Sequence, residues 1–413
     1  MVVTRLRPPM FAGMDSVIAR QAADLSARRV ALRLAWLLAA LLFAPPPAGA
    51  QDWPVYGGDA GGTRYSTAAM ITRDTVSRLA PAWTFHTGDR WPAGRQGASF
   101  EDTPILADGR LLVCTPTDRV IALDPLTGRP IWTYDPELAA GLEPGNSFLC
   151  RGVAVWHDAT AAPTSVCAAR VVLATLDARV IELDLATGEP CDGFGVHGTV
   201  RLPIDPAPLY PGELALDSPP AMLNDAVVVG SAIDDMTRAL SPGADVWALD
   251  ARTGATRWRF DPASGPGMTK GGKRLSGGGN VWAPIAVDAE RNLVFLPTAS
   301  PTAAFWGGER PGDDLFSSAV VALDGATGRV VWRFQTTHHD IWDYDVAAQP
   351  TLATVRRDGS DVPVVVVATK MGFLFVLDRT TGKQALLLLQ ATDGTWSEIV
   401  GNRPVQIESE SVP

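Results

Sequence analysis

The sequence predicts an all-β protein, and three observations lead to this prediction. The chain is rich in turn-forming residues, with 39 Gly and 33 Pro among its 413 residues, which is above average usage. One pattern of strand, tight turn and strand recurs five times. After residue 51, no long stretch shows the 3.6-residue apolar period of an amphipathic helix,.

The composition also excludes several classes of protein. Hydrophobic residues make up 46% of the chain and charged residues 19%, whereas a disordered chain requires low hydrophobicity and high net charge. The formal net charge is −10, whereas nucleic-acid binding requires a basic surface. We therefore expect an acidic globular protein with no nucleic-acid partner.

The first 50 residues have the pattern of a secretory signal peptide. Arg28 and Arg29 precede an apolar run over residues 30–44, followed by three prolines and the small-residue site at 48–50,. The run is shorter than the ~20 residues that span a bilayer, although a membrane anchor is the alternative. We expect a mature chain that starts at Gln51 and is exported to the periplasm, with membrane association as a second option.

Four cysteines lie in the first half of the mature chain: Cys114, Cys150, Cys167 and Cys191. Export permits disulfides, and no pair has the C-x-x-C spacing of a zinc or redox site. Four cysteines allow three pairings. We expect Cys167 to pair with Cys191, because these two flank one hairpin-like segment.

The repeat consists of an apolar stretch, an Asp-x-x-Thr-Gly turn and a strand that starts near a Trp. Its aspartates are Asp124, Asp184, Asp250, Asp324 and Asp378. The glycine of the turn is expected to need a positive φ, and the alternating Trp-x-[Phe/Tyr] pattern indicates a half-buried strand. In the second copy Cys191 replaces the Trp, and residues 82–85 look like the second half of another copy.

Further apolar strands precede each turn, which gives four-stranded antiparallel sheets. The aspartates are 60, 66, 74 and 54 residues apart. Sheets that repeat at this interval are typical of β-propeller blades. A Trp in each blade that packs between neighbouring sheets would explain 13 Trp against 5 Tyr.

These motifs carry a resemblance to a known family. The pattern Ala-x-Asp-x-x-Thr-Gly-x-x-x-Trp resembles the blade motif of the pyrroloquinoline-quinone (PQQ)-dependent dehydrogenases, or quinoproteins, which are eight-bladed propellers. The resemblance covers about residues 53–383 and is closest to the membrane-associated glucose, quinate and polyol dehydrogenases. Its most specific segment is 337–345, with support from 56–59, 150–153, 218–220 and 282–284.

The resemblance implies a base, a cation beside the quinone and a metal site. Asp343 matches the general base, and Lys370 matches the basic residue that contacts the quinone oxygens. In an extended segment Asp343 and Asp345 would share one face. Together with Asp234 they are expected to bind Ca²⁺ or Mg²⁺, since carboxylates are hard ligands. The competing interpretation is a solvated acidic turn.

The resemblance also implies contacts to the cofactor. Trp282 matches the ring that stacks on PQQ, with Asn280 as a nearby polar contact. Arg151 matches an arginine that pairs with a cofactor carboxylate, Glu101 an acid or amide near the ring, and Thr175 a weaker contact. The competing interpretations are a core tryptophan for Trp282 and blade-edge polar residues for Glu101, Arg151 and Thr175.

Three departures from the family pattern stand out. Thr117 occupies the position of a cofactor-binding His, and Ser300 that of an Asn that would supply an amide ligand. Beyond Lys383 the blade pattern stops, and residues 384–413 read as an unmatched polar tail. The 363 residues that follow the signal peptide (413 − 50) suffice for about five to six blades, so we expect a C-terminally truncated propeller over residues 51–383.

The function implied is the oxidation of an alcohol, sugar, polyol or cyclic hydroxy acid by hydride transfer to PQQ, with ubiquinone as the electron acceptor. Two alternatives stay open at this point. One is a non-catalytic propeller scaffold, which would not need Asp343, Asp345, Lys370 and Trp282 together. The other is an inactive, truncated gene product.

Overall fold

The structure is a computed structural model that describes residues 52–89, 97–264, 269–270, 273–274, 276–357, 359–390, 396–400 and 403–406. The chain forms two units, Met1–Gln51 with Ala68–Met70, and Asp52–Thr67 with Ile71–Pro413. The predicted signal peptide lies outside the described residues. No helix in the described part of the chain is long and apolar enough to cross a membrane.

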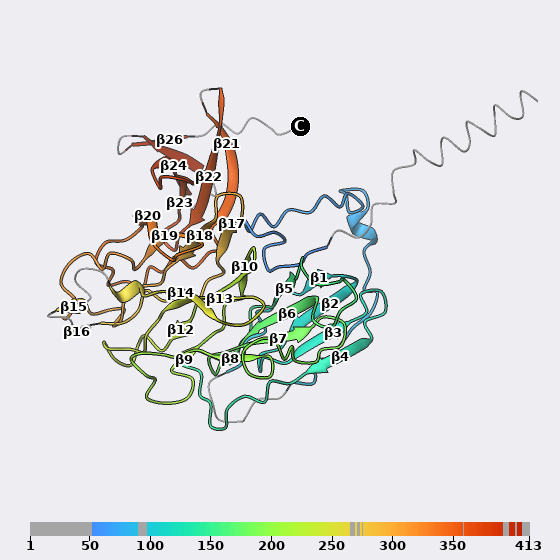
Figure 1. The fold of residues 1–413 in the computed structure, drawn as a ribbon. Helices are drawn as coiled ribbons and strands as arrows, with labels where there is room; N and C mark the ends of the chain where they lie inside the picture. The colour runs from blue at the N-terminus through green and yellow to red at the C-terminus, as the bar shows by residue number, and fades with distance from the viewer. Residues whose placement is uncertain are drawn as a thin grey trace, which may run out of the picture. The chain divides into compact units, whose positions relative to one another are not determined.

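Five large antiparallel sheets, called blades 1 to 5, follow one another along the chain (Figure 1). Blade 1 contains β1 (Ile105–Ala107), β2 (Arg110–Cys114), β3 (Val120–Leu123) and β4 (Pro130–Tyr134). Blade 2 contains β5 (Ala154–His157), β6 (Ala169–Ala174), β7 (Arg179–Asp184) and β8 (Thr199–Arg201). Blade 3 contains β10 (Ala221–Leu223), β11 (Ala226–Val229), β13 (Val246–Asp250) and β14 (Thr256–Phe260). The all-β propeller prediction is confirmed.

Blade 4 contains β17 (Ala286–Asp288), β18 (Leu293–Pro297), β19 (Ala319–Asp324) and β20 (Val330–Gln335). Blade 5 contains β21 (Thr351–Arg357), β22 (Ser360–Ala368), β23 (Phe373–Asp378), β24 (Gln384–Gln390), β25 (Trp396–Val400) and β26 (Arg403–Gln406). Two small sheets pair β9 (Leu214–Ala215) with β12 (Ala232–Ile233), and β15 (Thr269–Lys270) with β16 (Lys273–Arg274). Helical structure in the described residues is confined to two 3₁₀ helices, η1 (Val76–Arg78) and η2 (Pro262–Ser264).

Residues 384–390, which the sequence assigned to an unmatched tail, pair with β23 as the fourth strand of blade 5. The run of leucines at 386–389 therefore has a structural place. Leu387 packs on the core between blades 4 and 5.

The repeated turn connects the third and fourth strands within a blade, and it accepts a hydrogen bond from a tryptophan of the preceding blade. The side chain of Asp324 accepts hydrogen bonds from the backbone N–H and the hydroxyl of Thr327, at 2.9 and 2.7 Å. Gly328 then adopts a φ of 69°, as expected for its turn position. The indole Nε1 of Trp258, in blade 3, donates to the Gly325 carbonyl at 2.8 Å. Each seam of this type therefore joins a tryptophan of one blade to a turn of the next.

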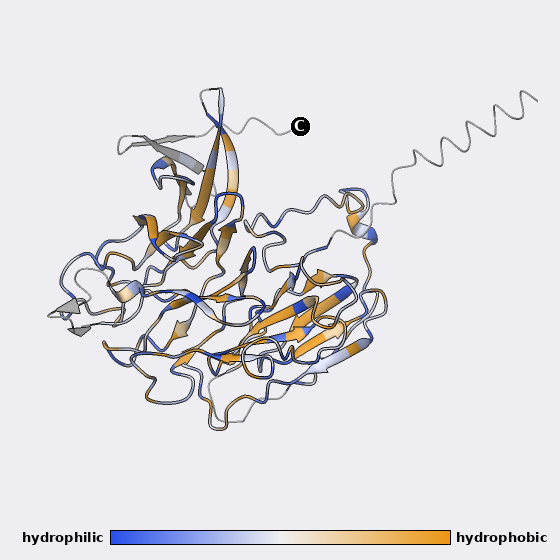
Figure 2. Cartoon of the chain, in the orientation of Figure 1, coloured by the Kyte–Doolittle hydropathy of each residue, from blue (hydrophilic) through white to orange (hydrophobic). Residues whose placement is uncertain are grey.

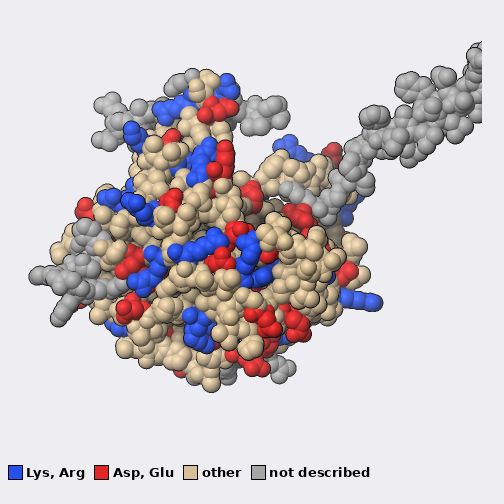
Figure 3. All heavy atoms as spheres, in the orientation of Figure 1, with Lys and Arg blue, Asp and Glu red and all other residues tan. Residues whose placement is uncertain are grey.

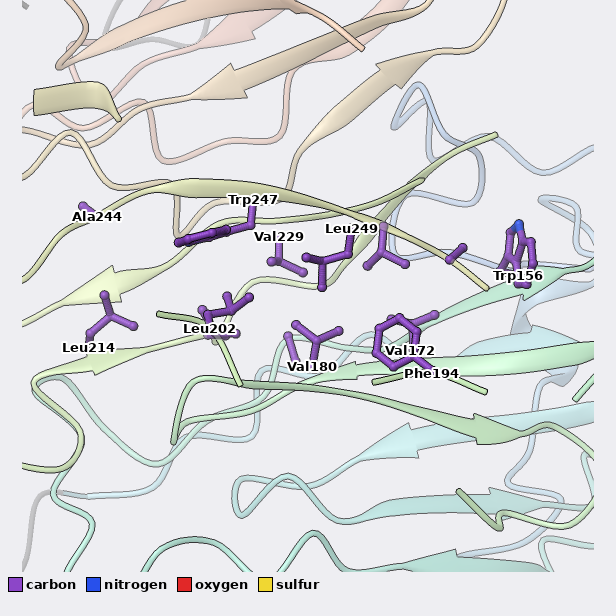
Figure 4. Close-up of a cluster of buried hydrophobic side chains, with 14 of the residues drawn as sticks. Trp156, Val172, Val180, Phe194, Leu202, Leu214, Val229, Ala244, Trp247 and Leu249 are labelled. Carbon is purple, nitrogen blue, oxygen red and sulfur yellow. The ribbon is translucent and has the colours of Figure 1, made fainter. Parts of the chain in front are cut away.

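Blades pack face to face through buried aliphatic and aromatic side chains, and the most hydrophobic residues fall on the strands (Figure 2). Figure 4 shows the core between blades 2 and 3. Its members include Trp156, Val172 and Val180 of blade 2 and Val229, Trp247 and Leu249 of blade 3.

On the face drawn in Figure 3, Lys and Arg side chains lie among Asp and Glu side chains.

The N-terminal segment 53–62 is hydrogen-bonded to four blades. Its backbone pairs with Leu106 of blade 1 and accepts bonds from Val155 of blade 2, Val287 of blade 4 and Leu352 of blade 5. These contacts join blades that are far apart in the sequence.

Two disulfides are present, Cys114–Cys150 and Cys167–Cys191, each with a Cα–Cα distance of 5.9 Å. The predicted Cys167–Cys191 pair is confirmed.

Candidate cofactor and metal site

One end of the blades carries the predicted site residues. Glu101, Arg151, Trp282 and Asp345 each lie shortly before the first strand of blades 1, 2, 4 and 5. In an antiparallel sheet the second strand ends where the first begins. Lys370, which follows the second strand of blade 5, is therefore brought to the same end.

A cavity of about 380 Å³ lies there. Its lining residues are Glu101, Asn146, Ser147, Leu149, Arg151, Asp217, Ile233, Asp235, Met236, Asn280, Trp282, Asp343 and Asp345.

One side of the cavity is acidic. Asp235, Asp343 and Asp345 all line it. The Lys370 ammonium lies 3.3 Å from Asp343 Oδ2 and 3.0 Å from Asp345 Oδ2, and it donates to the Asp343 carbonyl at 2.8 Å. Two carboxylates from the connection before blade 5 thus share one lysine, and Asp235 lines the same cavity.

Burial and mutual repulsion shift the pKa values of these groups. Burial, together with the negative charges of Asp345 and Asp343, raises the pKa of Asp235 to about 6. Burial and Asp343 also raise the pKa of Asp345, although a backbone hydrogen bond from Ser300 and the charge of Lys370 act in the opposite direction. Partial burial lowers the pKa of Lys370, but the two aspartates outweigh it and the net shift is upward. A further cation between the carboxylates would relieve their repulsion.

The carboxylate of Asp340, which is 1% exposed, bonds to the backbone of the loop that carries Asp343. Asp340 accepts hydrogen bonds from the backbone N–H groups of Trp342 and Tyr344 at 2.9 and 2.7 Å. Asp343 itself adopts a φ of 61°, which is uncommon for a residue other than glycine. The hydroxyl of Ser300 donates to Asp343 Oδ1 at 3.0 Å, and its backbone N–H donates to Asp345 Oδ1 at 2.6 Å.

The other side of the cavity combines a cation with an aromatic ring. The Arg151 guanidinium lies 4.9 Å from the centroid of the Trp282 ring. It pairs with Glu101 at 3.1 Å and with buried Asp217 at 2.7 Å. Burial raises the pKa of Asp217, and Arg151 offsets part of that shift.

Asn280 presents a buried oxygen to this region. Its side-chain nitrogen donates to the Ser231 carbonyl at 3.0 Å. Its Oδ1 is buried and finds no hydrogen-bond partner among the described residues. A buried acceptor of this kind suits a ligand that brings a donor or a cation.

The side chains of two predicted site residues bond to groups outside the cavity lining. Asp234 does not line the cavity, because its carboxylate accepts a hydrogen bond from the Tyr210 hydroxyl at 2.5 Å and its Cβ faces Gly145. Thr175 is fully buried, and its hydroxyl donates to Asp177 at 2.7 Å and accepts from the Arg179 backbone at 3.1 Å. Asp235, the next residue, lines the cavity in place of the predicted Asp234.

Sequence reasoning missed Asp217, Asp235 and the part played by Ser300. Asp217 directly precedes the Ser-Pro-Pro segment that supported the resemblance, so its position was a usable signal. Ser300 is predicted only as the loss of an amide ligand, yet it donates hydrogen bonds to Asp343 and Asp345.

Comparison with known proteins adds independent findings. Residues 53–388 match the family described as glucose/ethanol/alcohol dehydrogenase, β-propeller domain. The quinoprotein glucose dehydrogenase of Escherichia coli K12 is 36% identical over 347 residues, covering 82% of this chain and 43% of that protein. The quinate/shikimate dehydrogenase (quinone) of Acinetobacter baylyi is 36% identical over 361 residues, covering 80% and 43%.

A solved structure is also similar. The quinohemoprotein alcohol dehydrogenase of Comamonas testosteroni superposes with a TM-score of 0.67 at 28% identity, covering 87% of this chain and 52% of that one. The chain thus spans less than half the length of the two curated relatives and about half of this structure.

Proposed function

The chain belongs to the family of PQQ-dependent quinoprotein dehydrogenases, and from that premise we propose that it oxidises a CH–OH group to a carbonyl with PQQ and a divalent cation. The substrate class is an alcohol, sugar, polyol or cyclic hydroxy acid. The observation that carries the proposal is the convergence of Asp343, Arg151 and Trp282 on one cavity, with Lys370 paired to Asp343 behind it. A non-catalytic scaffold would have no need of this convergence.

The residues present fit PQQ, a flat tricyclic quinone with three carboxylates. The cavity of about 380 Å³ falls within the range of ~300–1,000 Å³ that is common for small-molecule sites. Trp282 offers a flat surface, and Arg151 offers a cation for a carboxylate. Glu101, whose side chain is 40% exposed, is the partner of Arg151 that such a carboxylate would displace.

The metal ion would be held by Asp235, Asp343 and Asp345, with the Asn280 oxygen as a neutral ligand. Carboxylate and amide oxygens are the ligands that Ca²⁺ and Mg²⁺ prefer. Burial first, and the neighbouring negative charges second, raise the pKa values of Asp235 and Asp345, and a cation would offset the repulsion between these charges.

In the reaction, bound PQQ supplies the acceptor for the hydride of the CH–OH carbon. Asp343 acts as general base and takes the hydroxyl proton. Lys370 forms ion pairs with Asp343 and Asp345 and places a positive charge where an oxyanion would be stabilised. Ser300 fixes the orientation of the Asp343 carboxylate, and Trp282 and Arg151 position the cofactor.

The proposal extends to the electron acceptor and the location of the protein. The acceptor is ubiquinone, which fits the word quinone in the name of the Acinetobacter baylyi relative. The location is the periplasm, with a membrane surface nearby, as the composition of residues 1–50 suggests,. Cell fractionation would test this location.

The activity is tested by incubating the purified chain with PQQ and Ca²⁺ or Mg²⁺, and measuring dye reduction with glucose, quinate and glycerol. We expect turnover with at least one of them. Asp343→Asn should retain PQQ but lose a factor of ~10²–10⁴ in turnover, the usual contribution of a general base. A folded sample that neither binds PQQ nor reduces dye would overturn the proposal, and full turnover by Asp343→Asn would remove the base assignment.

A further inference from the structure

We propose that the Cys114–Cys150 disulfide is a positioning element of the cofactor site, which fixes Arg151 in its binding geometry. This inference rests on the proposed function in so far as Arg151 is taken to contact PQQ. The disulfide lies one residue from Arg151 in the chain and joins it to the end of a blade 1 strand.

The two cysteines tie an irregular connection to a regular strand. Cys114 is the last residue of β2, whereas Cys150 lies in the connection between β4, which ends at Tyr134, and β5, which begins at Ala154. Both cysteines are buried, at 0% and 4% exposure. The disulfide is therefore an internal crosslink between blade 1 and the approach to blade 2.

Hydrogen bonds attach the Glu101 segment to the same crosslink. Asp102 Oδ2 accepts from the backbone N–H of Cys114 at 3.1 Å. The backbone N–H of Thr103 donates to the Arg151 carbonyl at 3.2 Å. The segment 101–103 is thus bonded to Cys114 and to Arg151, the residue that follows Cys150. The Glu101–Arg151 ion pair at 3.1 Å adds a second contact to Arg151.

Apart from these contacts, the backbone of Arg151 makes one long hydrogen bond among the described residues. Its N–H donates to the Asp217 carbonyl at 3.3 Å, and the following Gly152 has a φ of 146°, which other residues rarely adopt. Without the disulfide, the connection would gain conformational freedom that PQQ binding must then remove. Because ordering one residue involves a free energy equivalent to about a tenfold or greater change in affinity, we expect PQQ to bind tenfold to a hundredfold more weakly.

The chain offers a matched control in its second disulfide. Cys167 and Cys191 are also buried or partly buried in blade 2, and the crosslinked span is comparable, with a sequence separation of 24 against 36. Neither cysteine lines the cavity or adjoins a residue that does. Removal of this bond should reduce stability without a specific effect on PQQ affinity.

The experiment compares the full chain with the double variants Cys114→Ala/Cys150→Ala and Cys167→Ala/Cys191→Ala. PQQ affinity in Ca²⁺ is measured by quenching of tryptophan fluorescence, and hydrogen exchange is followed at the amides of Thr103 and Arg151. We expect weaker PQQ binding and faster exchange only in the first variant. If the first variant does not fold, the folded wild type is reduced and alkylated stepwise, and affinity is plotted against the fraction of each disulfide opened.

The outcomes separate the two proposals. Unchanged affinity and unchanged exchange in the first variant, or equal losses in both variants, would overturn the positioning role. If the wild type binds no PQQ, the proposed function fails, and the exchange rates of the two amides still decide whether the disulfide fixes this segment.

Discussion

The repeated turn makes a quantitative prediction about Gly328. Its φ of 69° is left-handed, and a Cβ built on it would lie 2.8 Å from atoms Cδ2 and Cε3 of the Trp258 ring. Gly328→Ala therefore introduces two penalties. The left-handed conformation of an alanine costs about 1 kcal/mol, and overpacking against the ring costs about 1–3 kcal/mol. The expected loss of unfolding free energy is about 2–4 kcal/mol.

Gly109→Ala is the matched control. Gly109 has a φ of 72°, and a Cβ added to it would meet no heavy atom within 4 Å. It carries the conformational penalty alone, so about 1 kcal/mol should be lost. Urea unfolding gives both values from the shift of the transition midpoint at constant slope.

A second background tests whether the ring is the cause. In a Trp258→Leu chain the contact is gone, so Gly328→Ala should lose no more stability than Gly109→Ala. The two sites should therefore couple by more than ~0.5 kcal/mol in the double-mutant cycle. Equal losses at Gly328 and Gly109 in the wild-type background would refute the reasoning that the tryptophan selects glycine here.

Three further predictions concern buried charge and the cofactor. Burial raises the pKa of Asp102 from 3.8 to about 7. The native state therefore keeps a proton that the unfolded chain releases, and the contribution of Asp102 to wild-type stability should fall by at most ~4 kcal/mol as pH rises from about 4 to 7. Urea titrations at several pH values should show a smaller total fall for Asp102→Asn than for the wild type. Arg170→Met should lower the free energy of unfolding by ~3 kcal/mol, since it leaves Glu182 buried without its partner,. An unchanged free energy in thermal unfolding would contradict a structural role for this ion pair. Trp282→Leu should weaken PQQ binding about tenfold through lost ring stacking, measured by calorimetry, with Trp156→Leu as a control at a distance from the cavity.

The blade repeat could be predicted because its chemistry is local. An Asp that binds the N–H and hydroxyl of a Thr three residues later, followed by a left-handed Gly, is visible in the sequence as Asp-x-x-Thr-Gly. The structure confirms this arrangement, for example at Asp124 with Thr127 and Gly128. A tryptophan at each such seam was also predicted, since Trp was in excess.

The exception in blade 2 could not be predicted from the motif. Cys191 replaces the seam tryptophan, and the sequence does not show what fills its role. In the structure Arg170 donates to the Ala251 carbonyl at 3.1 Å. That carbonyl follows the turn residue Asp250, which matches the acceptor Gly325 after Asp324. Arg170 also pairs with buried Glu182 at 2.7 Å, so a buried ion pair supplies the donor that an indole supplies elsewhere.

The choice between Asp234 and Asp235 shows why site residues are harder to predict than strands. Both follow the two-residue strand β12, and adjacent side chains point in different directions. The resemblance favoured Asp234. The contact with Tyr210 and the close approach of Gly145 hold Asp234 away from the cavity. Tyr210 and Gly145 are far from Asp234 in the sequence and belong to no motif that would indicate these contacts.

The loops between second and third strands explain the placement of both Thr175 and Lys370. Thr115, Thr175 and Thr369 follow the second strands of blades 1, 2 and 5, and the backbone N–H of each bonds to a carbonyl four residues on. Each threonine therefore closes its loop, which leaves the Thr175 hydroxyl occupied within the turn. The next residue differs among the blades: it is the buried Pro116 in blade 1, the buried Leu176 in blade 2 and the exposed Lys370 in blade 5. The threonine therefore has a structural role in all three loops, and in blade 5 the position after it supplies the lysine that pairs with the cavity aspartates Asp343 and Asp345.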